Sequence, residues 1–203
     1  MKQINKYIVE RLHINKDTGN HHYNYHPKTN DELKQLVKKL INERGNDADL
    51  NDINTSEITD MSALFYYSIF NGDISQWDVS KVQNMSNMFE DSKFNGDISN
   101  WDVSNVTDME GMFIYSNFTG ENGDISNWDV SNVKYMNSMF MRSRFNGDIS
   151  KWDVSNVEHM GSMFYNSTFN GDISKWNVSN VKNMSYIFDD SPLEKNPPKW
   201  YKE

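Results

Sequence analysis

Apolar residues recur in a fixed order along residues 49–190, with polar residues at the positions between them. Tryptophan marks five full copies, at spacings of 24, 27, 24 and 24 residues: Trp77, Trp101, Trp128, Trp152 and Trp176. A period of this length is typical of proteins in which similar units stack on one another. The one longer interval contains an insertion near Thr119-Gly120-Glu121, which we expect on a surface edge. The sequence therefore predicts one elongated repeat domain.

The first half of each copy has the spacing I-x-x-W-x-V-x-x-V, the same spacing as in leucine-rich repeats. Trp77, Asp78 and Val79 alternate between apolar and polar, which predicts a short strand over residues 76–80. The predicted fold class is a leucine-rich-repeat-like repeat solenoid of six right-handed coils, with short parallel strands stacked into one sheet about 4.8 Å apart. Asn71-Gly72 and its equivalents predict turns with positive φ.

An N-terminal α-helical cap is predicted within residues 29–48. Thr29 and Glu32 form a capping-box pattern, and Gly45 supplies the stop. The apolar stripe of this helix has helical spacing: Leu33, Leu36, Val37, Leu40 and Ile41. Because residues 49–65 are a degenerate first repeat, we expect the helix to cover the open core of that first coil.

Both ends of the chain depart from the repeat. Residues 1–14 predict a short amphipathic helix, which either packs on its own domain or docks on a partner, and residues 15–28 predict a polar linker. The candidate partner-docking residues are Ile4, Tyr7, Ile8 and Leu12. In residues 191–203, prolines end the period, and Trp200 with Tyr201 forms either a cap over the last coil or a linear aromatic motif.

Charge and composition narrow the possible partners. The chain has a net charge of −9, with nine Lys and Arg against six Asp and Glu in residues 1–48, and 11 against 23 in the remainder. The acidic array repels phosphate, so we expect no nucleic-acid partner. Without cysteine the chain has no disulfide and no thiolate metal site. No stretch is apolar enough for membrane insertion, and no signal peptide is recognisable, which predicts a cytoplasmic or virion-associated protein unless a partner or a missing leader brings it to a surface.

Acidic side chains form the strongest chemical pattern. The residue after each tryptophan gives a candidate ligand-facing ladder: Asp78, Asp102, Asp129, Asp153 and Asn177. A second series stands four residues before each tryptophan: Asp73, Asp97, Asp124, Asp148 and Asp172. Three interpretations remain open. Each Asp accepts backbone N–H bonds within its own turn, the stacked carboxylates hold a hard cation such as Ca²⁺, or the face binds a glycan or a peptide.

Other candidate chemistry is weaker. His21, His22 and His26 lie in the predicted linker and His13 lies just before it; a flexible loop lacks the converging ligands that a metal site needs. The tryptophans occupy leucine positions of the repeat, which predicts a core ladder rather than an exposed binding platform. A uniform carboxylate ladder lacks the asymmetric acid pair of a glycoside hydrolase. We therefore expect no catalytic residues and no cofactor.

The string F-N-G-D-I-S-x-W-D-V-S-N-V-x-x-M-x-x-M-F resembles the BspA-like leucine-rich-repeat surface proteins, in particular their bacterial surface repeat of about 25 residues, which is abundant in Mycoplasma lipoproteins and also found in gut bacteria and their phages. This resemblance covers about residues 49–190 and implies adhesion or protein–protein contact without catalysis. Residues 4–14 are similar to short leaders on proteins of large Bacteroidetes phages.

These observations favour a non-enzymatic binding or structural module that recognises a protein or a cell-surface partner, with a glycan as a possible ligand. One alternative is a virion or scaffold component docked through its N-terminal helix. A second alternative is a carbohydrate-active enzyme. The sequence does not fix the oligomeric state.

Overall fold

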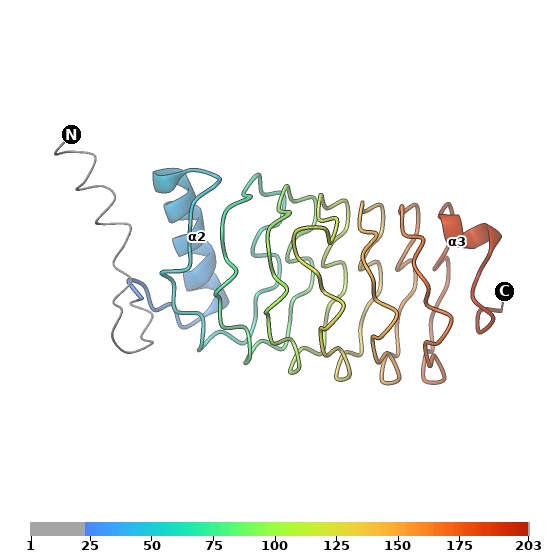
Figure 1. Cartoon of the computed structure of the whole chain (residues 1–203). Coiled ribbons are helices and arrows are strands. Elements are labelled where there is room, and N and C mark those ends of the chain that lie inside the picture. Colours follow the sequence, from blue (N-terminus) through green and yellow to red (C-terminus); the bar gives the residue numbers. More distant parts are fainter. Residues whose placement is uncertain (1–22, 203) are drawn as a thin grey trace.

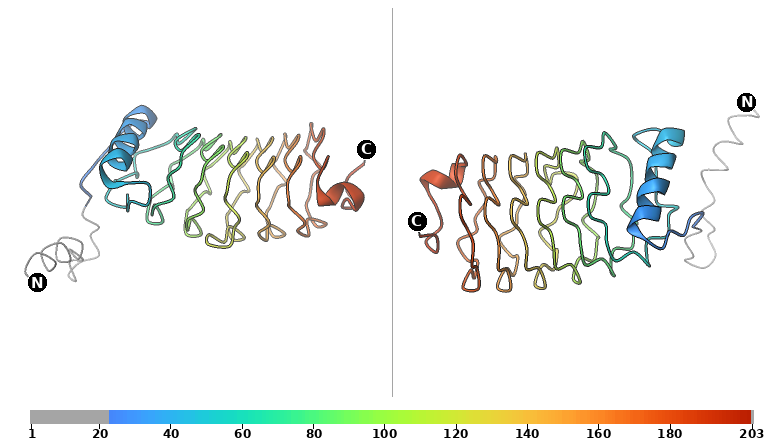
Figure 2. Two further views of the ribbon diagram at one scale, coloured as in Figure 1. Left: turned by 90° about the horizontal axis from the view of Figure 1, so that it is seen from above. Right: turned by 180° about the vertical axis from the view of Figure 1, so that it is seen from behind.

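The computed structural model describes residues 23–202, which form a row of similar coils (Figure 1). Two helices are present in these residues, α2 (Asn30–Arg44) and α3 (Pro192–Lys195). Figure 2 shows from two further sides that the coils follow one another along one axis, with α2 across one end and α3 at the other. Each coil corresponds to one sequence repeat: 47–70, 71–94, 95–118, 119–145, 146–169 and 170–190.

The predicted fold class, a leucine-rich-repeat-like solenoid whose short parallel strands form one sheet, is wrong. Residues 23–202 contain no strand and no sheet, only single parallel bridges, all but one of which join residues of neighbouring coils. Five of these bridges lie just before the Met-x-x-Met-Phe segment rather than at the predicted strand: Asp60–Asn84, Asn84–Asp108, Asp108–Tyr135, Tyr135–His159 and His159–Asn183.

Tight turns explain why residues 76–80 do not form a strand. The N–H group of Trp77 donates to the carbonyl of Ile74 at 3.2 Å, and that of Val82 donates to Val79 at 2.9 Å. Asp78 Oδ1 accepts from the N–H group of Ser80 at 3.0 Å. These bonds close a turn on either side of the Trp-Asp-Val segment, so too few consecutive extended residues remain for a ladder of paired strands.

A different ladder joins the coils. It is formed by the methionine half of each coil, which we define as residues 61–67, 85–91, 109–115, 136–142, 160–166 and 184–190. In the first of these, the N–H groups of Met61, Ala63, Phe65 and Tyr67 donate to carbonyls of the next coil, each at 2.9 Å. The same four bonds recur at every following junction, at 2.7–3.0 Å. Because only alternate residues donate and the residues between them close overlapping turns, this arrangement is not a β-strand.

Positive φ angles accompany these turns. In every methionine half, the third and seventh residues have left-handed backbone conformations; the non-glycine examples have φ from 49° to 58°. Left-handed φ costs a non-glycine residue roughly 1–2 kcal/mol. In the first five copies, the hydrogen bonds to the next coil offset part of this strain.

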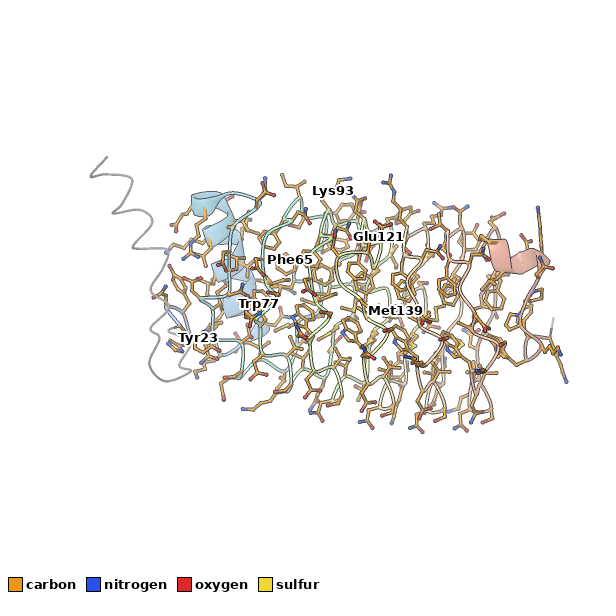
Figure 3. All side chains as sticks on the ribbon, in the orientation of Figure 1. Tyr23, Phe65, Trp77, Lys93, Glu121 and Met139 are labelled. Carbon is orange, nitrogen blue, oxygen red and sulfur yellow. The ribbon has the colours of Figure 1, made fainter. Side chains whose placement is uncertain are left out.

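Aromatic rings fill the interior of the row. The predicted tryptophan core is confirmed, since Trp77, Trp101, Trp128, Trp152 and Trp176 are each 3–5 % exposed. Each indole N–H donates to the preceding coil, as in the bond from Trp101 Nε1 to the Ile74 carbonyl at 3.3 Å. The phenylalanines of the methionine halves stack with centroids 5.5–6.1 Å apart: Phe65, Phe89, Phe113, Phe140, Phe164 and Phe188. Figure 3 places Phe65 and Met139 inside the row and Lys93 at its outer edge.

The Asn-Gly turns are needed for a different reason than predicted. Gly72 and Gly96 are not among the positive-φ residues. Instead, a Cβ atom on Gly72 would lie 2.0 Å from the Ala48 carbonyl oxygen of the preceding coil. Glycine therefore allows the close approach of neighbouring coils at this corner. In the longer coil, Gly120 has a φ of 85°, and the exposed Glu121 confirms the surface position expected for the insertion.

The predicted N-terminal helix is confirmed as α2. Thr29 is its N-cap and accepts from the N–H group of Glu32, and Gly45 follows the helix with a φ of 96°. Leu33, Val37 and Leu40 are buried against the core. From its first turn, Asn30 Nδ2 donates to the Asp60 carbonyl at 2.9 Å and to the Ser62 carbonyl at 3.3 Å. The helix thus covers both apolar and polar groups of the first coil.

At the other end, Trp200 continues the tryptophan ladder. It stands 24 residues after Trp176 and stacks on it with ring centroids 6.5 Å apart. Its Nε1 donates to the Ile173 carbonyl at 2.8 Å, the bond that every repeat tryptophan makes to its preceding coil. Tyr201 packs edge-on against Phe188. The period therefore persists through the proline-rich segment, as a partial seventh coil.

Candidate functional site

Each member of the predicted Asp ladder accepts a hydrogen bond within its own turn. Oδ1 of these residues accepts from the N–H group of the serine two positions later at 3.0–3.2 Å: Asp78, Asp102, Asp129, Asp153 and Asn177. The second Asp series does the same, as in the 2.9 Å bond from Ser99 to Asp97. Both series thus hold turns, and Asn177 shows that a neutral oxygen suffices.

The pKa of Asp153 agrees with a role in turns. Hydrogen bonds from the hydroxyl and the N–H group of Ser155 lower the pKa of this carboxyl. Mutual repulsion along a ladder would instead raise it. Within residues 23–202, no group of three or more His, Cys, Asp or Glu side chains is placed to hold a metal ion.

The chain exposes its most distinctive side chains at what we call the variable corner. This corner consists of the two residues that follow each Met-x-x-Met-Phe or its equivalent: Tyr66-Tyr67, Glu90-Asp91, Ile114-Tyr115, Met141-Arg142, Tyr165-Asn166 and Asp189-Asp190. No two coils carry the same pair here, and the pair just after the first methionine of each half also differs between all six coils. Because the fold repeats six times around different residues, the fold does not dictate the side chains of this corner.

Aromatic rings and one arginine form the centre of the variable corner. The guanidinium of Arg142 lies 5.3 Å from the ring centroid of Tyr115 and 5.8 Å from that of Tyr165. Its Nη1 donates to the hydroxyl of Tyr115 in the neighbouring coil. Hydrogen bonds to Tyr115 and Tyr165 raise the pKa of Arg142, which keeps it positively charged. Three coils thus contribute to one preorganised cluster.

A pair of tyrosines lies at the N-terminal end of the variable corner. Tyr66 and Tyr67 contact each other edge to face with centroids 4.4 Å apart. Tyr67 is 62 % exposed, and the neighbouring Ile69 is 64 % exposed. Large apolar side chains at such exposure remain available for contact with another molecule.

A polar groove lies at a second corner, over the last three full coils. Its volume is about 480 Å³, and it is lined by Asn132, Lys134, Asn156, Glu158, Asn180 and Lys182. The asparagines are already engaged, since each Nδ2 donates to a serine carbonyl of the preceding coil at 2.6–2.7 Å. Lys182 forms an ion pair with Glu158, and its hydrogen bond lowers the pKa of that carboxyl. Beside the groove, the rings of Tyr135 and His159 stack 5.5 Å apart.

The candidate partner-docking residues Ile4, Tyr7, Ile8 and Leu12 lie outside the described residues, as do His13, His21 and His22. Residues 23–28 of the predicted linker do contact the first coil. Tyr25 forms a parallel bridge with Ile53, and Arg44 of α2 lies over the Tyr25 ring, 5.7 Å from its centroid.

The sequence analysis missed the variable corner, although one signal for it was present. The repeat positions at which the six copies disagree are visible in the sequence without any structure. The Asp series drew attention because it is regular, yet regularity within a repeat marks residues that the fold itself requires.

These features define a class of protein: an array of turn-built coils with a partly exposed corner whose side chains vary from coil to coil. The chain belongs to the family described as Mycoplasma protein of unknown function, DUF285, whose model matches residues 32–121 and 114–200. The predicted membership in the BspA-like leucine-rich-repeat family is therefore wrong. The recurring string F-N-G-D-I-S-x-W-D-V-S-N-V-x-x-M-x-x-M-F suggested that family, whereas a different family model matches almost the whole row of coils.

No curated protein and no solved structure matches this chain. In residues 23–202, no helix combines the length and the apolar character needed to cross a membrane.

Proposed function

We propose that this protein is a non-enzymatic recognition module that binds another protein through the variable corner. The observation that carries the proposal is the preorganised cluster of Tyr115, Arg142 and Tyr165, which three successive coils build. Tyr115 and Arg142 are exposed, and Tyr165 is half-buried. Tyr and Arg are enriched in protein interfaces and among the residues that contribute most to binding.

Backbone strain supports the same surface. Tyr67, Tyr115 and Arg142 have φ values of 54°, 53° and 53°. Glycine would adopt this conformation without strain, yet the chain places large exposed side chains there. Backbone strain of this kind is frequent at functional sites. The third residue of each methionine half has the same backbone conformation but carries mostly small side chains, such as Ala63, Ser138 and Ser162.

A display library of random peptides tests this proposal. We expect the wild-type chain to enrich a peptide family, and the double variant Tyr115→Ala with Arg142→Ala to lose at least tenfold in affinity for it, as expected when central interface residues are truncated. The matched control is Asp102→Asn with Asp129→Asn, which preserves the serine bonds in the way that Asn177 does. The proposal fails if the corner variant binds the enriched peptides as well as the control does, or if no peptide is enriched.

The polar groove supports a second candidate function, glycan binding. Asn, Lys and Glu side chains line a cavity of about 480 Å³, and the exposed Tyr135 stands beside it. A sugar ring needs this combination of polar partners and an aromatic face. A glycan array with wild type and Tyr135→Ala tests this candidate, and a signal that Tyr135→Ala leaves unchanged would count against it.

A further inference from the structure

The ladder between coils has a direction. At each of the five junctions, the N–H groups of the earlier methionine half donate and the carbonyls of the later one accept, as from Phe113 to Met139 at 2.9 Å. All four peptide groups of a coil therefore point the same way, with N–H groups toward the C-terminal end of the row. Within the methionine halves, the N-terminal end of the row consequently presents carbonyl oxygens and the C-terminal end presents N–H donors. Just before each methionine half the direction is reversed, as in the bond from the Gln83 N–H group to the Thr59 carbonyl at 2.8 Å.

The carbonyl end is covered. The Asp60 and Ser62 carbonyls accept from Asn30 Nδ2, and the apolar stripe of α2 packs on the same coil. Another chain cannot reach these two carbonyls without displacing Asn30.

The donor end is largely uncovered. Among residues 23–202, no acceptor is present for the N–H groups of Met184, Tyr186, Phe188 or Asp190, although the equivalent groups in the five preceding coils are all bonded. The apolar residues beneath are also incompletely covered. These residues are only partly buried, whereas their equivalents in the four preceding coils are 0–1 % exposed: Val178, Val181 and Met184.

The C-terminal residues cover only part of this end. Trp200 lies on Trp176 and, at 5.8 Å between ring centroids, on Phe188, and Tyr201 also packs on Phe188. The tryptophan and phenylalanine side of the last coil is thus occupied. The valine and methionine side, with the N–H groups of Met184 and Tyr186, remains open.

We propose that this open end binds a segment of another protein, which runs across Val178, Val181 and Met184 and offers backbone carbonyl oxygens to the N–H groups of Met184 and Tyr186. This mode is analogous to the addition of a peptide strand to a sheet edge, in which main-chain bonds give affinity and apolar pockets give specificity. These N–H groups match a backbone whose alternate carbonyl oxygens point toward them. The following coil presents such carbonyls at each of the five junctions between coils.

The polarity and the local charge select this occupant. Head-to-tail stacking of a second copy is blocked at the Asp60 and Ser62 carbonyls, which Asn30 of α2 already occupies. Phosphate or another anion is disfavoured, because Asp189 and Asp190 carry negative charge next to the open N–H groups and Lys182 is paired with Glu158. Neutral carbonyl oxygens avoid this repulsion.

The test uses the full chain in solution and a synthetic peptide of residues 156–163, with blocked ends. This peptide contains the carbonyls that accept from the equivalent N–H groups, those of Met136 and Ser138, in the folded chain. It stops before Phe164 because Trp200 and Tyr201 already occupy the equivalent place at the open end. We expect fast hydrogen exchange at the Met184 and Tyr186 amides but slow exchange at Met160 and Ser162. We also expect saturable amide shifts on titration at Met184 and Tyr186.

Three controls make the result specific: a scrambled peptide, inorganic phosphate, and a charged variant. Val181→Asp places a carboxylate on the open end and should weaken peptide binding at least tenfold, whereas Asn170→Asp adds the same charge elsewhere on that coil and should not. The proposal is overturned if the Met184 and Tyr186 amides are already protected, if the scrambled peptide or phosphate gives the same shifts, or if no shifts occur. If Val181→Asp fails to fold, the titration of the wild-type chain with the peptide still tests the proposal. The corner double variant should bind this peptide normally, which separates this result from the proposed function.

Discussion

At the level of single residues, an acceptor oxygen matters more than a negative charge. Asp78 and Asn177 occupy equivalent positions, and each accepts from the serine two residues later. The sequence predicted the buried tryptophans because they occupy the leucine positions of the repeat. It left the role of the aspartates open, because an Asp that holds a turn and an Asp that binds a ligand have the same periodicity.

Acidic pH should weaken the fold through these turns. Backbone bonds from Ser150 and Ser174 lower the pKa of Asp148 and Asp172, and bonds from Ser155 lower that of Asp153. A lowered folded-state pKa gives stability that is complete above the ordinary value of 3.8 and is lost as pH falls through the lowered value. In urea unfolding, we expect stability to be flat above about pH 5 and to fall below about pH 4.

Replacing Asp148, Asp153 and Asp172 together by asparagine should flatten this acidic decline, because Asn can accept the same bonds without titrating. The variant should remain folded at neutral pH, as the natural Asn177 implies. An unchanged slope between pH 4 and pH 2 would show that other groups cause the acid sensitivity.

The left-handed positions allow a second test at the residue scale. Ser138 has a φ of 56°, and the equivalent position in the preceding coil is Gly111 with a φ of 63°. Ser138→Gly should change the free energy of unfolding by less than about 1 kcal/mol, whereas the β-branched Ser138→Val should destabilise by about 1–3 kcal/mol. Thermal unfolding of both variants measures the difference, and equal stabilities would contradict the backbone assignment.

At the level of elements, the unit of this fold is the overlapping turn rather than the strand. The apolar–polar–apolar order of Trp77-Asp78-Val79 has the period of two that is typical of a strand. Three residues are too few, however, to distinguish a strand from a short extended segment between two turns. The frequent D-x-S pattern was the better guide, because an Asp side chain that bonds the N–H group two residues on competes with strand pairing. Helix α2 was predictable because its capping pattern and its apolar stripe indicate a helix over the same residues.

The contact between α2 and the first coil can be tested through Asn30. Asn30→Ala removes the donor to the Asp60 and Ser62 carbonyls and should destabilise the chain by about 1 kcal/mol. Asn30→Asp should cost more, about 2–3 kcal/mol at neutral pH, because a carboxylate would face carbonyl oxygens and the Asp60 side chain. The difference between the variants should shrink near pH 3, and an effect of Asn30→Asp no larger than that of Asn30→Ala would contradict this role.

At the level of the whole molecule, the two ends of the row are closed differently. The N-terminal end has a helix, while the C-terminal end has Trp200 in phase with the ladder and leaves the valine side open. The predicted cap by Trp200 and Tyr201 was correct in its contacts, but its continuation of the 24-residue period was missed, because prolines replace the isoleucine and serine that usually precede the tryptophan.

The contribution of this partial coil is measurable. Trp200→Ala should destabilise the chain by about 2 kcal/mol, since it uncovers Trp176 and leaves the Ile173 carbonyl without its indole donor. Trp200→Phe should lose less, because it keeps the stacked ring. Hydrogen exchange should become faster in residues 170–190 and stay unchanged around α2. Uniform loosening of the entire row would contradict a local capping role.

The central claim is that coils without strands are joined, in their methionine halves, by a ladder in which every N–H group donates to a carbonyl of the next coil. NMR on the labelled chain tests it most directly, through scalar couplings across hydrogen bonds and backbone chemical shifts. We predict couplings from the amide of Phe113 to the carbonyl of Met139 and from that of Phe140 to Met163, with left-handed shifts at Ser138 and Arg142. Uniform β-strand shifts across residues 136–142, with couplings in both directions along that segment, would contradict the account.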